Sequence, residues 1–351
     1  MIENNIQHKI NFKGILFSLG LFLFMTASVY GQRNRYGVKL EEKNGSYIIA
    51  GEKTFKELYK GDFSKLPADY YTPYKGYQPN LIKDEDYLNC ITKKYVFKEY
   101  SKENYVLNIE IDIPKVKLEG GRLYPFIIWV HGGGWIGGDV DGFKNQSQYL
   151  ASRGIAGVRI DYSLEKQGGH FEQGMKEIEE SLQFVKKHCN ELGIDTSMFG
   201  FAGGSAGTPL ASLSAMKYSK DGCCLYIGGN GIYDFENNRD GKFCGGNLSK
   251  NKYLGNIIDY KSISAISNIP EKKNQVPSVI LFHGTADITI SCKQSIAFGN
   301  AIKDKGGISE VHLYKYYTHA FFNQNSSDAY EDVLLKMYDF ANKIFKMPVK
   351  K

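Results

Sequence analysis

A serine between glycines offers the clearest chemistry in this sequence. Gly203–Gly207 reads GGSAG and matches the pattern G-x-S-x-G, with Ser205 at its centre. The motif follows a short apolar run at 198–202 and opens a segment at 206–218 that can form a helix. A strand-to-helix turn of this kind holds a serine hydroxyl at its apex, where a neighbouring base can activate it. Pro209 fits the first turn of such a helix, where N–H groups lack partners. We therefore expect Ser205 to be a nucleophile.

A triple glycine follows another apolar run and can supply an oxyanion hole. His131–Trp135 reads HGGGW, directly after a stretch that has the character of a buried strand. A glycine-rich loop has backbone N–H groups that can converge on one oxygen, as acyl transfer requires. We expect these donors to be the N–H groups of Gly133, Gly134 and Ala206. His131, at the end of the strand, is expected to hold the loop rather than to catalyse.

The acid and the base of such a site follow the serine along the chain, in the order Asp or Glu and then His. His319 comes after the strand-like run that contains His312, so a loop can deliver it to the serine. We therefore predict His319 as the base, with His312, inside that strand-like run, as the alternative. Asp287 follows another strand-like run and is the predicted acid, with Asp234, after the preceding strand, as the alternative. The acid would accept the second imidazole N–H, fix its tautomer and stabilise the imidazolium.

The same glycine-rich segment also fits a dinucleotide-binding pattern. Gly132–Gly137 matches G-x-G-x-x-G, and Asp161 ends the next strand-like run, as an acidic ribose ligand would. Asp161 lies beyond the ~20-residue spacing of that pattern, and Trp135 would crowd a pyrophosphate. We therefore expect no nucleotide and no other cofactor.

The order of apolar segments predicts the framework that would bring these residues together. Two alternating, β-rich segments come first and are expected to pair antiparallel. Strands then alternate with helices, which implies right-handed βαβ units, a mostly parallel sheet and helices on both of its faces. The expected strands are 95–100, 105–113, 123–130, 155–162, 198–202, 225–228, 276–282 and 311–316, and the expected helices are 142–153, 172–190, 206–218, 295–303 and 330–345.

The N-terminus has the pattern of a secretory signal. Lys9 and Lys13 precede the apolar run Gly14–Met25, and small residues follow it. We expect residues 1–31 to be a signal peptide, the protein to be secreted or periplasmic, and the mature chain to begin near Gln32 without a membrane span. An uncleaved anchor is the alternative, although the run is short for a span of about 20 residues. N-terminal sequencing of protein from its native host checks the prediction, and a cytoplasmic chain that retains its first residues would contradict it.

The remainder of the chain divides by composition. Residues 32–90 are polar and rich in Tyr and predict an N-terminal extension, whereas residues 91–351 are expected to form the catalytic domain. Within that domain, residues 229–275 hold many Gly and Asn and are expected to cross the carboxyl edge of the sheet.

Overall charge and cysteine content exclude some other classes of function. Lys and Arg number 44 against 38 Asp and Glu, giving +6 with no dense basic block, so nucleic-acid binding is not expected. The six cysteines have no regular spacing and form no CxxC pair, so we predict neither a disulfide framework nor a metal site.

Together the motifs resemble the HGGG-bearing esterase group of the α/β-hydrolase superfamily, and above all its carbohydrate acetyl- and feruloyl-esterase-like branch. The resemblance spans about residues 95–345 and includes HG-x-x-D at His283–Asp287 and H-x-F at His319–Phe321. It implies an α/β-hydrolase fold and a serine ester hydrolase that acts through an acyl-enzyme. The sequence departs from the hormone-sensitive-lipase branch, because Gly204 stands where an Asp is usual and the Pro-Glu after the Asp-Tyr strand is absent. Thr208–Pro209 also replaces a glycine often found after the elbow.

The resemblance implies a carbohydrate ester substrate with a short, acetyl-type acyl group or a feruloyl group. Trp135 beside the oxyanion loop is expected to wall a small acyl pocket, and the Tyr-rich stretch before Tyr105 offers surfaces for sugar rings. The alternatives are a serine peptidase of the prolyl-oligopeptidase type and a non-catalytic binding protein on the same fold. Such peptidases usually carry a large N-terminal propeller, for which residues 32–90 are too few.

Overall fold

The computed structural model describes residues 40–43, 46–49, 82–237, 242–243, 246–247, 251–255, 257–287, 289–315, 317–323 and 329–346. The predicted signal peptide at 1–31 and most of the predicted extension at 32–90 lie outside these residues.

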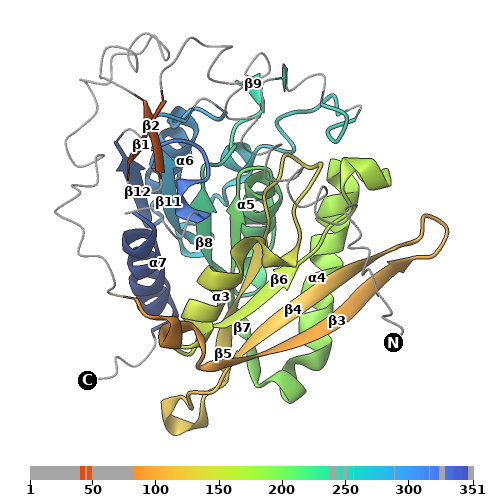
Figure 1. Ribbon diagram of the computed structural model, residues 1–351, viewed down its shortest axis with the longest axis vertical. Helices are drawn as coiled ribbons and strands as arrows, with labels where there is room; N and C mark the ends of the chain where they lie inside the picture. Colours follow the sequence, from red (N-terminus) through yellow and green to blue (C-terminus); the bar gives the residue numbers. More distant parts are fainter. Residues whose placement is uncertain are drawn as a thin grey trace, which may run out of the picture.

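An eight-stranded sheet is the centre of the fold, and Figure 1 shows it running from β12 and β11 beside α6 to β4 and β3 at the opposite end. Its strand order is β12-β11-β8-β7-β5-β6-β4-β3. The pairings β3–β4 and β4–β6 are antiparallel, and every other neighbouring pair in this sheet is parallel. The predicted antiparallel pair and the mostly parallel sheet are therefore confirmed. The strands are β3 (Cys90–Tyr100), β4 (Tyr105–Pro114), β5 (Tyr124–Val130), β6 (Ala156–Ile160), β7 (Ile194–Gly204), β8 (Cys223–Gly229), β11 (Ser278–Gly284) and β12 (Ser309–Tyr314).

Helices cover both faces of this sheet. Successive side chains on a strand point to opposite sides, and on the central strands both sets are apolar and need cover. On β5, Ile128 and Val130 join one buried apolar cluster together with residues of α4, α5 and α6. Ile127 and Trp129 join a second cluster with residues of α3 and α7. The helices are α3 (Lys144–Ala151), α4 (Phe171–Leu192), α5 (Gly207–Lys217), α6 (Lys293–Asp304) and α7 (Tyr330–Phe345).

Short pairs of strands lie outside the main sheet. β1 (Leu40–Lys43) pairs with β2 (Ser46–Ile49), and β9 (Lys242–Phe243) pairs with β10 (Gly246–Asn247). Within the described part of the chain, no helix is both long and apolar enough to cross a membrane.

The carboxyl ends of β5, β7, β8, β11 and β12 meet at one edge of the sheet, where open α/β sheets build their sites. The segments that leave these ends contain the oxyanion loop, Ser205, Asn230, Asp287 and His319. The topology alone therefore gathers the predicted site residues, which lie far apart in sequence, and adds Asn230, which the sequence patterns do not predict.

Candidate active site

Ser205 lies on the sharp turn between β7 and α5, in a left-handed backbone conformation with φ of 50°. Its N–H donates to the carbonyl of Gly229 at 2.9 Å, which ties the turn to the end of β8. A Cβ on Gly207 would lie 2.2 Å from the Val130 oxygen, and one on Gly203 would lie 2.7 Å from the Gly207 oxygen. Both glycines are therefore required for the strand and the helix to approach this closely.

Thr208 explains one departure from the resemblance. Its buried hydroxyl donates to the Ser205 carbonyl at 2.5 Å and accepts the N–H of Ile232 at 3.0 Å. The side chain therefore connects the nucleophile turn to the segment that follows β8. Pro209 lies in the first turn of α5, as expected, where it displaces no intrahelical hydrogen bond.

The glycine at position 204 has a steric cause. A Cβ at this position would lie 2.8 Å from Phe143 Cζ and 3.2 Å from Phe322 Cζ. The two rings are parallel, with centroids 6.2 Å apart, and both are buried. They occupy the space that an aspartate before Ser205 would need.

The structure brings Ser205, His319 and Asp287 into one chain of hydrogen bonds. The Ser205 hydroxyl lies 2.7 Å from His319 Nε2, and His319 Nδ1 lies 2.7 Å from Asp287 Oδ2. The geometry is that of a hydroxyl donating to a base whose second N–H donates to a carboxylate. Asp287 is buried, whereas the His319 side chain is 22% exposed, so the base is reachable from solvent and the acid is not.

Asp234 and His312, the alternative acid and base, contact other residues. Asp234 accepts hydrogen bonds from the backbone and the side chain of Asn237. His312 stacks on Phe282 with ring centroids 5.5 Å apart, and its Nε2 lies 3.2 Å from Glu310. The structure thus joins His319 to Ser205 and Asp287 to His319 by hydrogen bonds, whereas these contacts of Asp234 and His312 are with other residues.

Asp287 is held as an anion by several donors. Its Oδ1 accepts the N–H groups of Thr289 and Ile290 at 2.8 and 2.9 Å. Burial alone would raise the pKa of this carboxyl, but the charges and hydrogen bonds of His319 and His283 outweigh it and hold the pKa well below its usual range. The carboxylate is therefore ionised throughout the range in which a histidine titrates.

His283 also belongs to the site, although no role is predicted for it from the sequence. It is fully buried, its Nε2 lies 3.2 Å from Asp287 Oδ2 and 3.0 Å from the Ile290 carbonyl, and its Nδ1 lies 2.7 Å from Ser295 Oγ. The HG-x-x-D motif could have indicated a role, because it places His283 at the end of β11, four residues before the acid Asp287. The ring braces the segment that carries Asp287.

The oxyanion loop lies directly against the nucleophile turn. A Cβ on Gly132 would lie 2.9 Å from the Gly204 oxygen and 3.2 Å from Ser205 Cβ. Gly133 and Gly134 have φ of 118° and 65°, which side chains other than glycine rarely adopt. Within the described residues, the N–H groups of Gly133, Gly134 and Ala206 donate to no protein acceptor. These amides are thus free to donate to a ligand oxygen, as the sequence analysis expects.

Trp135 lies beneath this loop. Its ring has no exposed surface, its Nε1–H donates to the Ala206 carbonyl at 2.7 Å, and it stacks on Tyr253 with centroids 5.3 Å apart. The residue therefore links the oxyanion loop to the nucleophile turn. In this structure the Trp135 ring is buried, so it could contact an acyl group only if it became exposed. The side chain of the next residue, Ile136, is 60% exposed.

His131 holds the start of the loop, as expected. Its Nδ1 lies 2.7 Å from the Gly132 carbonyl, and its ring stacks on Tyr162 with centroids 4.4 Å apart. Burial lowers the pKa of this imidazole, which favours the neutral form.

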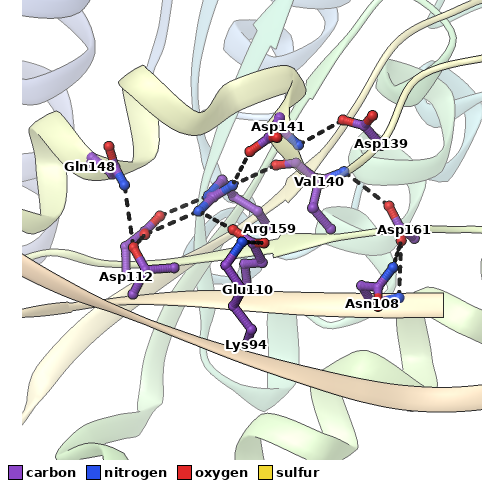
Figure 2. A network of polar contacts seen from close by, with 11 residues as sticks. Lys94, Asn108, Glu110, Asp112, Asp139, Val140, Asp141, Gln148, Arg159 and Asp161 are labelled. Carbon is purple, nitrogen blue, oxygen red and sulfur yellow. Dashed lines mark hydrogen bonds and ion pairs between the residues drawn. The ribbon is translucent and has the colours of Figure 1, made fainter. Parts of the chain in front are cut away.

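A buried ionic network anchors the segment that follows the oxyanion loop (Figure 2). Arg159, on β6, donates to Asp112 and Glu110 of β4 at 2.8 Å each, and its Nη1 donates to the Val140 carbonyl at 2.8 Å. Asp161 accepts the Val140 N–H at 2.9 Å and the Asn108 side chain at 2.8 Å. Breaking a buried pair by removing one partner costs about 3–5 kcal/mol, so the network holds this segment firmly on the sheet. The carboxylate of Asp161, which would bind the ribose in the dinucleotide alternative, is thus occupied by Val140 and Asn108.

Within the described residues, no group of three His, Cys, Asp or Glu side chains is arranged to hold a metal ion. The site presents a hydroxyl, an imidazole, a carboxylate and backbone N–H groups.

Fold and site define the class: the chain has the α/β-hydrolase fold, and the relatives and solved structures that it resembles are esterases. Residues 110–302, more than half of the chain, match the family model described as BD-FAE, and the chain therefore belongs to the BD-FAE family.

Individual relatives agree with this assignment. The chain is 28% identical over 236 residues to a probable isoprenylcysteine alpha-carbonyl methylesterase of Oryza sativa subsp. japonica, covering 61% of this chain and 55% of that protein. It is 34% identical over 91 residues to an acetyl esterase of Salmonella paratyphi B, covering 26% of this chain and 28% of that protein. The chain spans about half the length of the first of these curated relatives. Among solved structures, it is similar to Thermogutta terrifontis esterase 2 phosphonylated by cyclosarin, with a TM-score of 0.62, 25% identity, and coverage of 74% of this chain and 96% of that chain.

Proposed function

We propose that this protein hydrolyses carboxylic esters through a Ser205-His319-Asp287 triad and an acyl-enzyme. One observation carries the proposal: a continuous path of two 2.7 Å hydrogen bonds runs from the Ser205 hydroxyl to the buried carboxylate of Asp287.

The first half of the reaction forms the acyl-enzyme. His319 Nε2 takes the hydroxyl proton while Ser205 Oγ attacks the ester carbonyl, and Asp287 stabilises the imidazolium. The N–H groups of Gly133, Gly134 and Ala206 donate to the oxyanion of the tetrahedral intermediate, where charge develops. As the intermediate collapses, the C–O bond to the alcohol breaks and the imidazolium returns its proton to the departing alkoxide.

The second half releases the acid and restores the enzyme. His319 takes a proton from a water molecule, whose oxygen attacks the acyl carbonyl of the Ser205 ester. The same backbone donors hold the second oxyanion. Collapse breaks the bond to Ser205 Oγ, which recovers its proton from His319, and the carboxylic acid leaves.

We further propose that the substrates are carbohydrate esters of short, acetyl-type acyl groups or of feruloyl groups. The similarity of a 91-residue segment to an acetyl esterase supports a short acyl group. Other relatives are named methylesterases, which supports a substrate with a small group on one side of the ester. In a methyl ester, however, the small group is the alcohol and not the acyl group. The peptidase and the non-catalytic binding protein are the alternatives to be tested.

A substrate panel tests this proposal. We expect kcat/KM to be higher for acetyl and other short esters than for acyl chains longer than about eight carbons, because a tail without a pocket gains no transition-state binding. The panel includes acetylated and feruloylated saccharides, a prenylcysteine methyl ester and a proline peptide. Values of kcat/KM that rise steadily with acyl length would favour a lipase, and preferred cleavage of the peptide would favour the peptidase.

A further inference from the structure

Asn230 lies between the strand that carries the nucleophile and the strand that precedes the acid. It follows β8 directly, and β8 pairs with β7 on one side and β11 on the other. Its N–H donates to the Phe282 carbonyl of β11 at 2.9 Å, while the preceding Gly229 carbonyl accepts the Ser205 N–H at 2.9 Å. This short segment therefore connects the backbone of the nucleophile turn to the strand that leads to Asp287.

The side chain of Asn230 reaches the acid itself. It is fully buried, and its Nδ2 donates to Asp287 Oδ2 at 2.5 Å, the same oxygen that accepts His319 Nδ1–H at 2.7 Å. The other carboxylate oxygen is occupied by two backbone N–H groups. Oδ2 is thus surrounded by Asn230, His319 and, at 3.2 Å, His283 Nε2, and of these only the Asn230 amide donates without being able to titrate.

The amide oxygen of Asn230 indicates that packing alone does not explain why an asparagine stands at this position. Asn230 Oδ1 is buried and has no hydrogen-bond partner among the described residues. The backbone is left-handed, with φ of 48°, where glycine is the least strained residue and Asn is one of the few tolerated alternatives. A glycine would satisfy the backbone without burying an unpaired acceptor. The feature that a glycine lacks is the Nδ2 donor.

We propose that Asn230 is a positioning residue of the triad, whose amide holds the Asp287 carboxylate in the orientation that receives His319 Nδ1–H. The proposal rests on the proposed function, because its purpose is to keep the base aligned with Ser205. Other titratable groups around this carboxylate are His319 itself, His283 and Cys292. His283 is held by Ser295 and Ile290, and burial raises the pKa of the Cys292 thiol to about 12, so it stays neutral.

Two substitutions separate positioning from packing. Asn230→Gly keeps the left-handed backbone and removes the donor, and we expect kcat to fall roughly 10- to 100-fold with KM within about twofold, because small misplacement of a catalytic group has effects of this size. Asn230→Asp keeps the shape and brings a second carboxylate to the pair. We expect the acidic limb of the pH profile of kcat/KM to move up by about one pH unit, since the added charge stabilises the protonated His319.

Asn237→Asp is the matched control, because Asn237 Nδ2 donates to Asp234 Oδ2 at 2.7 Å outside the triad. It makes the same chemical change beside another carboxylate, and we expect the wild-type profile. Circular dichroism and Tm identify any variant that fails to fold. If Asn230→Gly does not fold, the pH profile of Asn230→Asp alone decides the proposal.

An NMR titration of the His319 imidazole, assigned with a His319→Gln variant, provides a readout that needs no turnover. A pKa of His319 that is higher in Asn230→Asp than in the wild type supports the positioning role. If folded Asn230 variants retain the wild-type kcat, acidic limb and His319 titration, the proposal is wrong. A wild-type protein without ester turnover would remove the proposed function, and the titration would still decide the role of Asn230.

Discussion

Ser205→Ala is expected to lower kcat for ester hydrolysis by about 10⁴- to 10⁶-fold, because the members of a triad act as a unit and the nucleophile has no substitute. The loss should leave Tm close to that of the wild type. Ser205 Oγ contacts His319 at the surface of the site, and the turn itself is held by backbone contacts and by Thr208. Steady-state kinetics on an acetyl ester, with a fluorophosphonate label as a second readout, measures the effect.

Ser214→Ala is the matched control for this substitution. Ser214 lies in the same helix α5, is buried, and its hydroxyl has no hydrogen-bond partner among the described residues. Its removal should change neither turnover nor labelling. If purified Ser205→Ala retains wild-type turnover, both the nucleophile and the mechanism built on it must be abandoned.

The sequence predicts the triad because each member is defined by its position relative to a strand. Ser205, Asp287 and His319 each follow a strand-like run, and parallel strands bring such positions to one edge of the sheet. Local pattern also distinguished His319 from His312, since a residue inside a strand has its direction set by the pleat and a loop residue does not. The fold class therefore follows from the periodicity, and the candidate site follows from motifs that stand at the ends of the predicted strands.

Contacts that depend on side-chain packing across elements were not predictable in this way. Asn230 looks in the sequence like one of many polar residues of the Gly- and Asn-rich segment, and only the distance of its amide from Asp287 distinguishes it. The position of Trp135 beside the oxyanion loop predicts that its ring faces the substrate. A positive φ of 63° at that residue, together with the stacking on Tyr253, directs the ring inward, and neither feature is visible in a one-dimensional pattern.

Element boundaries show the same limit. The strand expected at 198–202 extends over Ile194–Gly204 as β7, because Ile194 pairs with Tyr124 of β5 and Gly204 pairs with Gly229 of β8. Tertiary pairing overrides intrinsic preference at such ends. Gly204 illustrates a further point: its identity is set by two rings from distant segments, Phe143 and Phe322.

Asp287→Asn is the second substitution with a large expected effect, a fall in kcat of about 10⁴-fold. The amide would present an N–H group where His319 Nδ1 now finds an acceptor, so the imidazole would lose the partner that fixes its tautomer and stabilises its charged form. Any residual activity should have its acidic limb at lower pH, because the imidazolium is no longer paired with a carboxylate. The pH profile of kcat/KM measures both effects. Asp234→Asn is the control, and we expect it to retain full turnover, since Asp234 contacts Asn237 instead of His319.

The same substitution makes a prediction for stability. The pKa of Asp287 is held below its unfolded value by His319 and His283 despite burial, so its ionised form favours the folded state. That contribution is complete above the unfolded pKa of about 3.9 and is lost as the pH falls through the lower, folded value. We therefore expect Asp287→Asn to have a lower Tm than the wild type at pH 7, with a difference that narrows below about pH 4. Thermal melts between pH 3 and pH 7 provide the measurement. A Tm difference that stays constant over this range would show that the charge of Asp287 does not stabilise the fold, and an activity loss of less than tenfold would show that it is not the acid of the triad.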